Sequence, residues 1–270
     1  MSVYKLNGKD LSLREMRRIA EGRGIDFGSF VEELVAHAYQ NVVAAGDVVV
    51  DGGAARGWHT FSLAKLVGPK GRVHAVEALA DNCEFLRTRA RQWRYEEGVV
   101  VHELALGTEN GSTKFQRVVE HAGLSGIKRA WLPADAAVEE IEVPLRKLED
   151  IIPVEEWARL TFIKLDLEGG EFTALKHGAE KLIAAARPII VFENGRQAAA
   201  ALYSYTETEF FGFFDRLNYD LIDIFAEPFT RDVFATGSAD APFEFVAIPV
   251  EARSRQLPQK LRAHLEARIG

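Results

Sequence analysis

The stretch from Val48 to Thr60, VVVDGGAARGWHT, decides the fold. An apolar run ends in an acid, and a glycine-rich turn then leads directly into a second apolar segment. This order is typical of a strand that passes the chain to a helix beside a bound cofactor. In a doubly wound sheet, such a turn lies beyond the carboxyl ends of the strands, where ligands bind.

Composition limits the classes of protein that fit. The 270 residues are 47% apolar and 27% charged, which predicts one large folded domain with a full core. Acidic residues outnumber basic ones by 40 to 33, so the formal charge of -7 does not favour a nucleic-acid partner. The single cysteine, Cys83, cannot form an intramolecular disulfide, and this indicates a reducing compartment.

Hydropathy adds an expectation about location. No apolar segment approaches the length that spans a bilayer, and the N-terminus lacks the apolar core of a signal peptide. We therefore expect a cytoplasmic protein without stable membrane insertion. A homodimer stays open.

The first part of the chain is expected to be helical. Ser12-x-x-Glu15 and Ser29-x-x-Glu32 both have the form of a capping box, and apolar residues follow on one helical face. We predict an N-terminal helical segment at residues 1–46, followed by a cofactor-binding domain at 47–270.

From Asp47 onward, short apolar runs alternate with amphipathic stretches. The runs DVVVDGG and RVHAVEA flank the helical pattern TFSLAKLVG, which predicts a βαβ unit and a parallel sheet. Asp81-x-x-Glu84 is expected to cap the next helix, before a strand in GVVVHELALG.

The alternation is interrupted between residues 110 and 154. Two strands, near TKFQRV and EEIEVPL, are expected there as an excursion from the sheet. The alternation resumes with the strand LTFIKL, a helix carrying Phe172, Leu175, Ala179 and Leu182 on one face, and the strand PIIVFEN. The last two strands, YDLIDIF and FEFVAIP, have no expected helix between them, which suggests an antiparallel hairpin at the sheet edge. The predicted class is α/β, a mostly parallel doubly wound sheet with an antiparallel edge strand, preceded by N-terminal helices.

The glycine-rich turn indicates which cofactor binds. Residues 52–57, GGAARG, lack the middle glycine of the dinucleotide fingerprint, and Asp51 precedes them. An acid would repel a pyrophosphate but attract a ligand with a cationic centre and an ammonium group, such as S-adenosylmethionine. Glu77, at the end of the second strand, would accept the ribose hydroxyls of either cofactor. In a purely structural alternative, Asp51 only caps the following helix and Glu77 is solvated.

The sequence resembles the FkbM-type S-adenosylmethionine-dependent methyltransferases. The likeness runs from about Asp47 to Pro249 and is most specific in FIKLDLEGGEFTALKHGAEKL followed by RPIIVFENG. It implies a Rossmann-like methyltransferase fold with a final antiparallel strand, and methyl transfer, usually to oxygen, often on sugars or natural products. Ala78 and the run Ala54-Ala55-Arg56 depart from the family pattern without removing a charged group that the cofactor needs.

The predicted site residues lie at the ends of the strands. The cofactor-binding set comprises Asp51, Gly52, Gly53, Gly57, Glu77, Ala105, Leu106 and Asp166. The candidate catalytic residues are Asp166, Glu168 and His59, because an in-line methyl transfer needs positioning and often a base for the acceptor proton.

Structural roles compete with these assignments. Acids at a helix start are favoured by the helix dipole, so Glu168 and Glu171 need no catalytic purpose, and His59 is equally suited to packing. No metal site is assigned, although Asp166 could share a metal with Glu168 and Glu193.

The functional prediction is methylation of a hydroxyl on a small-molecule or glycan acceptor. One alternative is a nicotinamide-dependent oxidoreductase, against which Asp51 and the missing glycine argue. Another is a non-catalytic cofactor-binding module, because a fold alone does not establish function.

Overall fold

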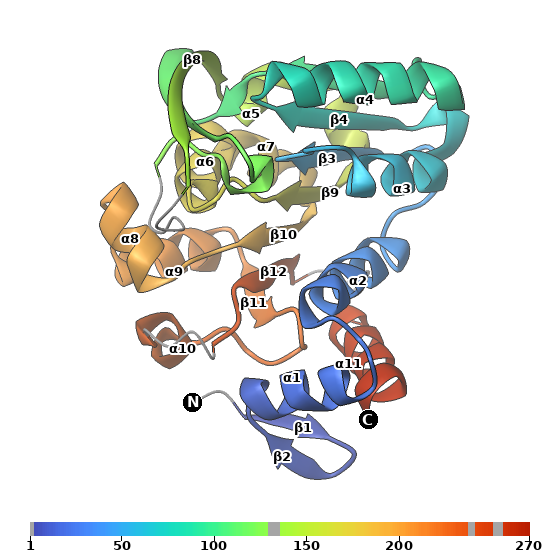
Figure 1. Ribbon diagram of the computed structural model, residues 1–270, viewed down its shortest axis with the longest axis vertical. Coiled ribbons are helices and arrows are strands. Elements are labelled where there is room, and N and C mark those ends of the chain that lie inside the picture. Colours follow the sequence, from blue (N-terminus) through green and yellow to red (C-terminus); the bar gives the residue numbers. More distant parts are fainter. Residues whose placement is uncertain (1–2, 129–135, 237–240, 251–255) are drawn as a thin grey trace.

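A seven-stranded sheet lies at the centre of the protein (Figure 1). The computed structural model describes residues 3–128, 136–236, 241–250 and 256–270. From one edge to the other the strands are β11 (Tyr219–Asp223), β12 (Glu244–Pro249), β10 (Ile189–Glu193), β9 (Leu160–Leu165), β3 (Val48–Gly52), β4 (Arg72–Glu77) and β5 (Val99–Glu103). Strand β12 is antiparallel to both of its neighbours, and the other neighbouring pairs are parallel. The predicted mostly parallel α/β sheet is confirmed.

Alternation along β3 explains why the sheet is covered on both faces. Val49 points into one hydrophobic cluster, whereas Val48 and Val50 point into another, and all three are fully buried. A strand buried on both faces is typical of a parallel sheet with helices on each side.

Helices cover both faces, as the doubly wound class requires. Those that contribute to the Val49 cluster are α1 (Leu13–Gly22), α2 (Phe27–Gln40), α3 (Trp58–Val67), α4 (Ala80–Trp93) and α11 (Leu257–Ile269). Those that contribute to the Val48 and Val50 cluster are α5 (Leu148–Ile151), α6 (Glu171–Gly178), α7 (Glu180–Ala186), α8 (Gln197–Tyr203), α9 (Glu207–Arg216) and α10 (Arg231–Ala235). Short 3-10 helices lie at Gly68–Lys70, Ala122–Leu124 and Val154–Arg159.

The excursion forms a small sheet of its own. Strands β6 (Ala105–Leu106), β8 (Val138–Arg146) and β7 (Gly111–Val118) are paired in that order. Ala105 and Leu106 were expected at the exit of the third main-sheet strand; they lie two and three residues beyond the end of β5 and pair with β8. The excursion therefore lies beside the carboxyl ends of β4 and β5.

The N-terminal segment contains a hairpin as well as the expected helices. Strands β1 (Tyr4–Leu6) and β2 (Lys9–Leu11) precede α1. The Tyr4 hydroxyl donates to Asp223 at the end of β11 over 3.0 Å, and α2 packs against α11. The domain boundary predicted at residue 46 stays a prediction.

Two of the expected helix caps are wrong. The Ser12–Glu15 capping box is present, but α2 is capped by Asp26, whose carboxylate accepts the Ser29 N–H, so Ser29 lies inside the helix. Helix α4 begins at Ala80 after Leu79, so Asp81 lies in its first turn. In both cases an upstream residue takes the cap position, and the residue predicted as the cap lies in the first turn of the helix.

Two connections also differ from expectation. The helix after Glu171 is interrupted at Ala179, whose ψ of 4° with φ of -146° separates α6 from α7. The short helix α10 lies between β11 and β12, which were expected to be joined without one. These two strands do form an antiparallel pair at the sheet edge, with β11 outermost and the antiparallel β12 one place further in.

Candidate active site

The turn after β3 touches the segment that follows β9. Gly53 has a φ of 76°, and its N–H and that of Ala54 donate to the carbonyl oxygen of Val76. A Cβ atom at Gly53 would lie 1.9 Å from the carbonyl oxygen of Asp166. Only glycine allows this approach, so the turn holds Asp166 beside the expected cofactor site.

Asp51 lies beneath this turn rather than in a cavity wall. The residue is 1% exposed, and one carboxylate oxygen accepts a hydrogen bond from the Thr60 hydroxyl over 2.5 Å. The other oxygen, Oδ1, has no hydrogen-bond partner among the described residues. Asp51 therefore ties the turn to the first residues of α3 and keeps one unpaired acceptor.

Glu77 supports the same turn from the end of β4. Its two carboxylate oxygens accept the N–H groups of Ala55 and Leu79 over 2.8 and 2.7 Å. Burial raises the pKa of Glu77 above its ordinary value, and these backbone N–H groups oppose that rise. The carboxylate is thereby fixed at the border of a narrow cavity.

The narrow cavity has a volume of about 90 Å³ and lies between the main sheet and the excursion. Ala105, Leu106, Phe115 and Ile127 give it an apolar wall. Glu77 stands at its border. An apolar slot with one acid at its edge suits a flat heterocycle attached to a sugar.

A second, larger cavity of about 870 Å³ lies on the other side of the turn. Gly57 and His59 line it at the start of α3, and Gly53, Ala55 and Asp166 line both cavities. The two cavities thus meet at the turn after β3 and at the residue after β9. Gly52 and Asp51 line neither of them.

His59 is held by a residue of the N-terminal segment. Its Nε2 lies 2.7 Å from a carboxylate oxygen of Glu32, and the ring is largely buried. Its Nδ1 has no hydrogen-bond partner among the described residues. The Glu32 contact therefore fixes the ring in the lining of the larger cavity.

Asp166 and Lys164 form an ion pair at the end of β9. The Lys164 ammonium lies 3.2 Å from the Asp166 carboxylate and is itself buried. Burial disfavours the charged form of each side chain, but the attraction between the two charges is the stronger effect. The pKa of Lys164 is therefore raised, mainly by Asp166 and Asp51, and the pKa of Asp166 is lowered, mainly by Lys164. Asp166 is therefore ionised at neutral pH.

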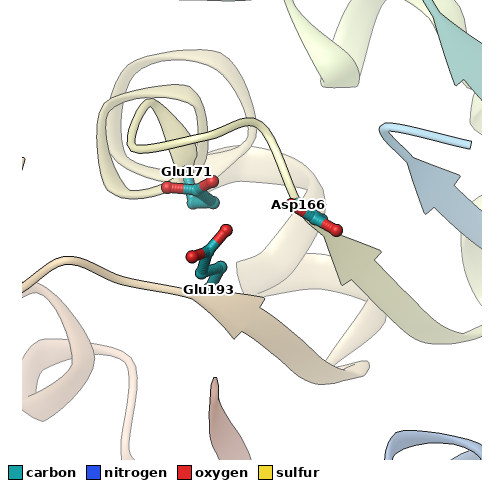
Figure 2. A group of neighbouring side chains, drawn as sticks. All are labelled: Asp166, Glu171 and Glu193. Atoms are coloured by element: carbon teal, nitrogen blue, oxygen red, sulfur yellow. The ribbon is translucent and has the colours of Figure 1, made fainter. Parts of the chain in front are cut away.

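Asp166 also belongs to a cluster of acids with Glu171 and Glu193 (Figure 2). One oxygen from each carboxylate lies within 4.8 Å of the others. Figure 2 shows the Glu193 side chain, at the end of β10, pointing toward that of Glu171. Glu171, rather than Glu168, completes the group that was expected to include Asp166 and Glu193.

Burial keeps protons on this cluster. One oxygen of Glu171 accepts the N–H groups of Leu167 and Gly169, while Oε2 has no partner among the described residues. Burial raises the pKa of Glu171 to about 8. Burial, and next the charge of Asp166, likewise raise the pKa of Glu193 well above its ordinary value. The cluster therefore carries fewer charges at neutral pH than it has carboxyl groups.

Glu168 lies on the loop between β9 and α6. Its φ of 61° is in the left-handed region, which is uncommon for a residue with a side chain, and it lines the narrow cavity. The structure therefore places Glu168 near the expected cofactor, apart from the acidic cluster.

Three residues that bear on the site were not among the predicted site residues. Glu32 was read only as part of a capping box, although it holds His59. Glu244 is buried and lies directly opposite Glu193 on the neighbouring strand. Like charges directly opposite one another destabilise a strand pair, so two facing acids indicate a functional site. Tyr203 packs against Gly169 and Gly170, a contact that no sequence pattern indicates.

Comparison with known proteins identifies the family. The family model of the methyltransferase FkbM domain matches residues 51–221. No curated protein sequence matches the chain.

Among solved structures, the methyltransferase FkbM of Methylobacillus flagellatus KT is 19% identical, with a TM-score of 0.47 over 77% of this chain. The chain spans 49% of that protein's length. An S-adenosylmethionine-dependent O-methyltransferase of Thermotoga maritima is 12% identical over 93% of this chain and 78% of its own, with a TM-score of 0.40. Fibrillarin of Aeropyrum pernix, solved with S-adenosylmethionine, is 11% identical over 80% and 74%, with a TM-score of 0.42.

The family match covers the turn after β3, Glu77, the narrow cavity and the acidic cluster, but neither Glu32 nor Glu244. The chain belongs to the FkbM methyltransferase family.

Proposed function

We propose that the protein transfers a methyl group from S-adenosylmethionine to a hydroxyl oxygen of a small-molecule or glycan acceptor. The observation that carries this proposal is the meeting of two cavities at Gly53, Ala55 and Asp166. One cavity suits an adenosine, and the other leaves room for an acceptor. A group-transfer enzyme needs two ligands to meet at one point.

The donor set fits S-adenosylmethionine. Glu77 would accept the ribose hydroxyls, and the apolar wall around Leu106 and Phe115 would hold the adenine. The carboxylate of Asp166 stands at the junction of the cavities, where a cationic ligand is favoured. When bound, S-adenosylmethionine supplies an electrophilic methyl group on a positively charged sulfur.

The residues of this chain would position the acceptor and remove its proton. Asp166 is ionised and can accept the proton of an acceptor hydroxyl. Lys164 holds the Asp166 carboxylate in place over 3.2 Å. His59 is a second candidate, because it lines the larger cavity and Glu32 fixes the orientation of its ring. Glu168 is the third candidate, at the border of the narrow cavity.

The competing functions make different predictions about ligands. A nicotinamide-dependent oxidoreductase needs a site for a pyrophosphate, whereas this turn is flanked by the carboxylates of Asp51, Glu77 and Asp166. A non-catalytic module would bind the methyl donor without turnover.

Calorimetry with S-adenosylmethionine, its demethylated product and NAD tests the proposal. We expect binding of the first two and none of NAD. Glu77→Gln keeps one acceptor oxygen but removes the charge, and should weaken cofactor binding by about 1–3 kcal/mol because the ribose hydroxyls lose a charged partner. Glu103→Gln, at the exposed end of the adjacent strand β5, is the matched control and should bind normally. Unchanged affinity in the Glu77 variant would remove the assignment.

A further inference from the structure

Three basic side chains lie along the larger cavity without acidic partners. Arg56, Lys65 and Arg89 line it, and within the described part of the chain none of them forms an ion pair with a carboxylate. Arg91, on the same helix as Arg89, does pair with an acid, Glu84. In a protein with a formal charge of -7, this wall is a local excess of positive charge.

Aromatic rings fix two of these cations. The guanidinium carbon of Arg56 lies 5.2 Å from the centre of the Phe85 ring. That of Arg89 lies 5.1 Å from the same ring and 4.9 Å from the ring of Trp93. A guanidinium stacked on a ring keeps the N–H donors at its edge available for a planar anion. The two arginines are therefore preorganised to bind carboxylate or phosphate oxygens.

The same cavity also offers exposed aromatic surface. Trp58 is 58% exposed and Trp93 is 51% exposed, and both are in the cavity wall. Large aromatic rings that stay in contact with solvent bind ligands with an apolar face and polar edges, as a sugar ring has. Asp166 belongs to this wall too, so the basic residues and the candidate base share one cavity.

We propose that the methyl acceptor is an anionic saccharide, whose carboxylate or phosphate binds Arg56 and Arg89 while its hydroxyl lies at Asp166. This inference rests on the proposed function, because it assigns the larger cavity to the acceptor. The volume of about 870 Å³ is within the range of cavities that bury a ligand larger than one small metabolite.

Paired probes test the charge requirement by calorimetry, with and without the demethylated cofactor. A hyaluronan tetrasaccharide is compared with neutral tetra-N-acetylchitotetraose, and a hexose phosphate with the unphosphorylated hexose. The first pair tests a carboxylate and the second a phosphate. We expect at least one anionic probe to bind about tenfold or more tightly than its neutral counterpart, and to weaken as salt is raised.

Substitutions locate the binding surface. Arg56→Gln and Arg89→Gln should each weaken the anionic probe about tenfold, because each removes a charged hydrogen-bond donor. The affinity for the demethylated cofactor should stay within about twofold. Arg91→Gln is the matched control on helix α4, since Arg91 does not line the cavity, and it should bind like the unaltered protein.

Several results would overturn the proposal. If neither anionic probe binds more tightly than its neutral counterpart, a requirement for negative charge on the acceptor is excluded. A parallel loss of cofactor affinity in the arginine variants would assign these cations to the cofactor instead. Tighter binding of a single-stranded RNA oligonucleotide, lost in the same variants, would identify a nucleic-acid partner. Failure of the proposed function is distinguishable from all of these, because the unaltered protein would then not bind S-adenosylmethionine.

Discussion

Asp166 is the residue on which the proposed chemistry depends. It lines both cavities, pairs with Lys164 and belongs to the acidic cluster. Its place after β9 was predictable, because the carboxyl end of a central parallel strand is a ligand site. Its contact with the backbone of Gly53 was not, because the packing of two turns that are distant in sequence leaves no periodic signal.

Asp166→Asn should abolish most of the turnover without unfolding the protein. The change keeps the size of the side chain and removes the charge, so turnover should fall by roughly two to four orders of magnitude, as general-base removal typically produces. Cofactor affinity should change much less. The measurement is a methyl-transfer assay on an accepted substrate, with Asp220→Asn on the exposed side of β11 as control. Near-normal turnover in a folded Asp166→Asn protein would contradict a role as base.

Chelation separates a base from a metal ligand. If Asp166, Glu171 and Glu193 act only through protons, a chelator should leave the turnover of the unaltered protein unchanged, because no metal then takes part. Loss of turnover on chelation, restored by excess magnesium, would assign the cluster to a cation instead.

Glu171 predicts the direction of a pH effect on stability. Its pKa is raised from 4.5 to about 8 in the folded protein, so the folded state keeps a proton that the unfolded chain has lost between these values. The free energy of unfolding should therefore fall as pH rises through this window, by up to about 1.4 kcal/mol per pH unit from this group. Urea unfolding at a series of pH values measures the slope.

Glu171→Gln should flatten that slope. The glutamine side-chain oxygen can still accept the N–H groups of Leu167 and Gly169, so the loop keeps its bonds. Glu266→Gln, on the exposed side of α11, should leave the slope unchanged. A slope that persists in the Glu171 variant would assign the pH dependence to other groups.

At the scale of the element, the turn after β3 is the part that tolerates least change. Gly53 and Gly24 have nearly the same φ, 76° and 75°, so alanine meets the same backbone strain at both. At Gly24 nothing lies within 4 Å of an added Cβ, whereas at Gly53 the carbonyl oxygen of Asp166 lies 1.9 Å away. Comparison of the two alanine variants therefore separates the destabilisation caused by the clash with Asp166 from that caused by the left-handed backbone conformation.

Gly53→Ala should therefore destabilise the protein by several kcal/mol, and Gly24→Ala by only about 1 kcal/mol. Urea unfolding of both variants measures the difference. Equal costs would mean that the two turns can separate without penalty. Cofactor binding should fail in Gly53→Ala even under conditions where the variant is folded, since its clash displaces the Asp166 backbone.

The strands were more predictable than the helix ends. Each main-sheet strand coincides with an apolar run in the sequence, because a strand that is buried on both faces needs apolar residues at successive positions. The predictions of Ser29 and Asp81 as caps were wrong because serine and aspartate also occur in the first turn of a helix. Only the tertiary structure decides at which residue the helix begins. The break at Ala179 follows Gly178, but the apolar positions Phe172, Leu175, Ala179 and Leu182 keep a helical spacing through it, so the spacing predicts one continuous helix.

At the scale of the whole molecule, the N-terminal segment and the C-terminal helix complete one face of the sheet. Residues of β1, α1, α2 and α11 share a single hydrophobic cluster with those of β3, β4 and β9. Arg268 on α11 pairs with Glu33 on α2 at 2.7 Å. Within the described residues, no helix is both long enough and apolar enough to cross a membrane.

We predict that the N-terminal segment unfolds together with the sheet. Tyr4→Phe removes the hydrogen bond to Asp223, which is buried and has its pKa raised to about 7 by burial, and should cost about 1–3 kcal/mol because an acceptor loses its partner. Circular dichroism and tryptophan fluorescence should still report one coincident transition. Two separate transitions would favour residues 1–46 as an independent unit. Tyr95→Phe serves as control, because Tyr95 lies between α4 and β5, and β5 and β11 form opposite edges of the sheet.

The close approach of Gly53 to the Asp166 carbonyl also limits how such a protein can evolve by recombination with related sequences. The two segments are separated by more than half of the matched domain, yet their backbones lie so close together that a side chain at Gly53 would clash with Asp166. A recombination event that exchanges one segment with a relative would pair turns that have not been selected together. Viable chimaeras should therefore inherit both segments from one parent, while the excursion between them is free to come from another.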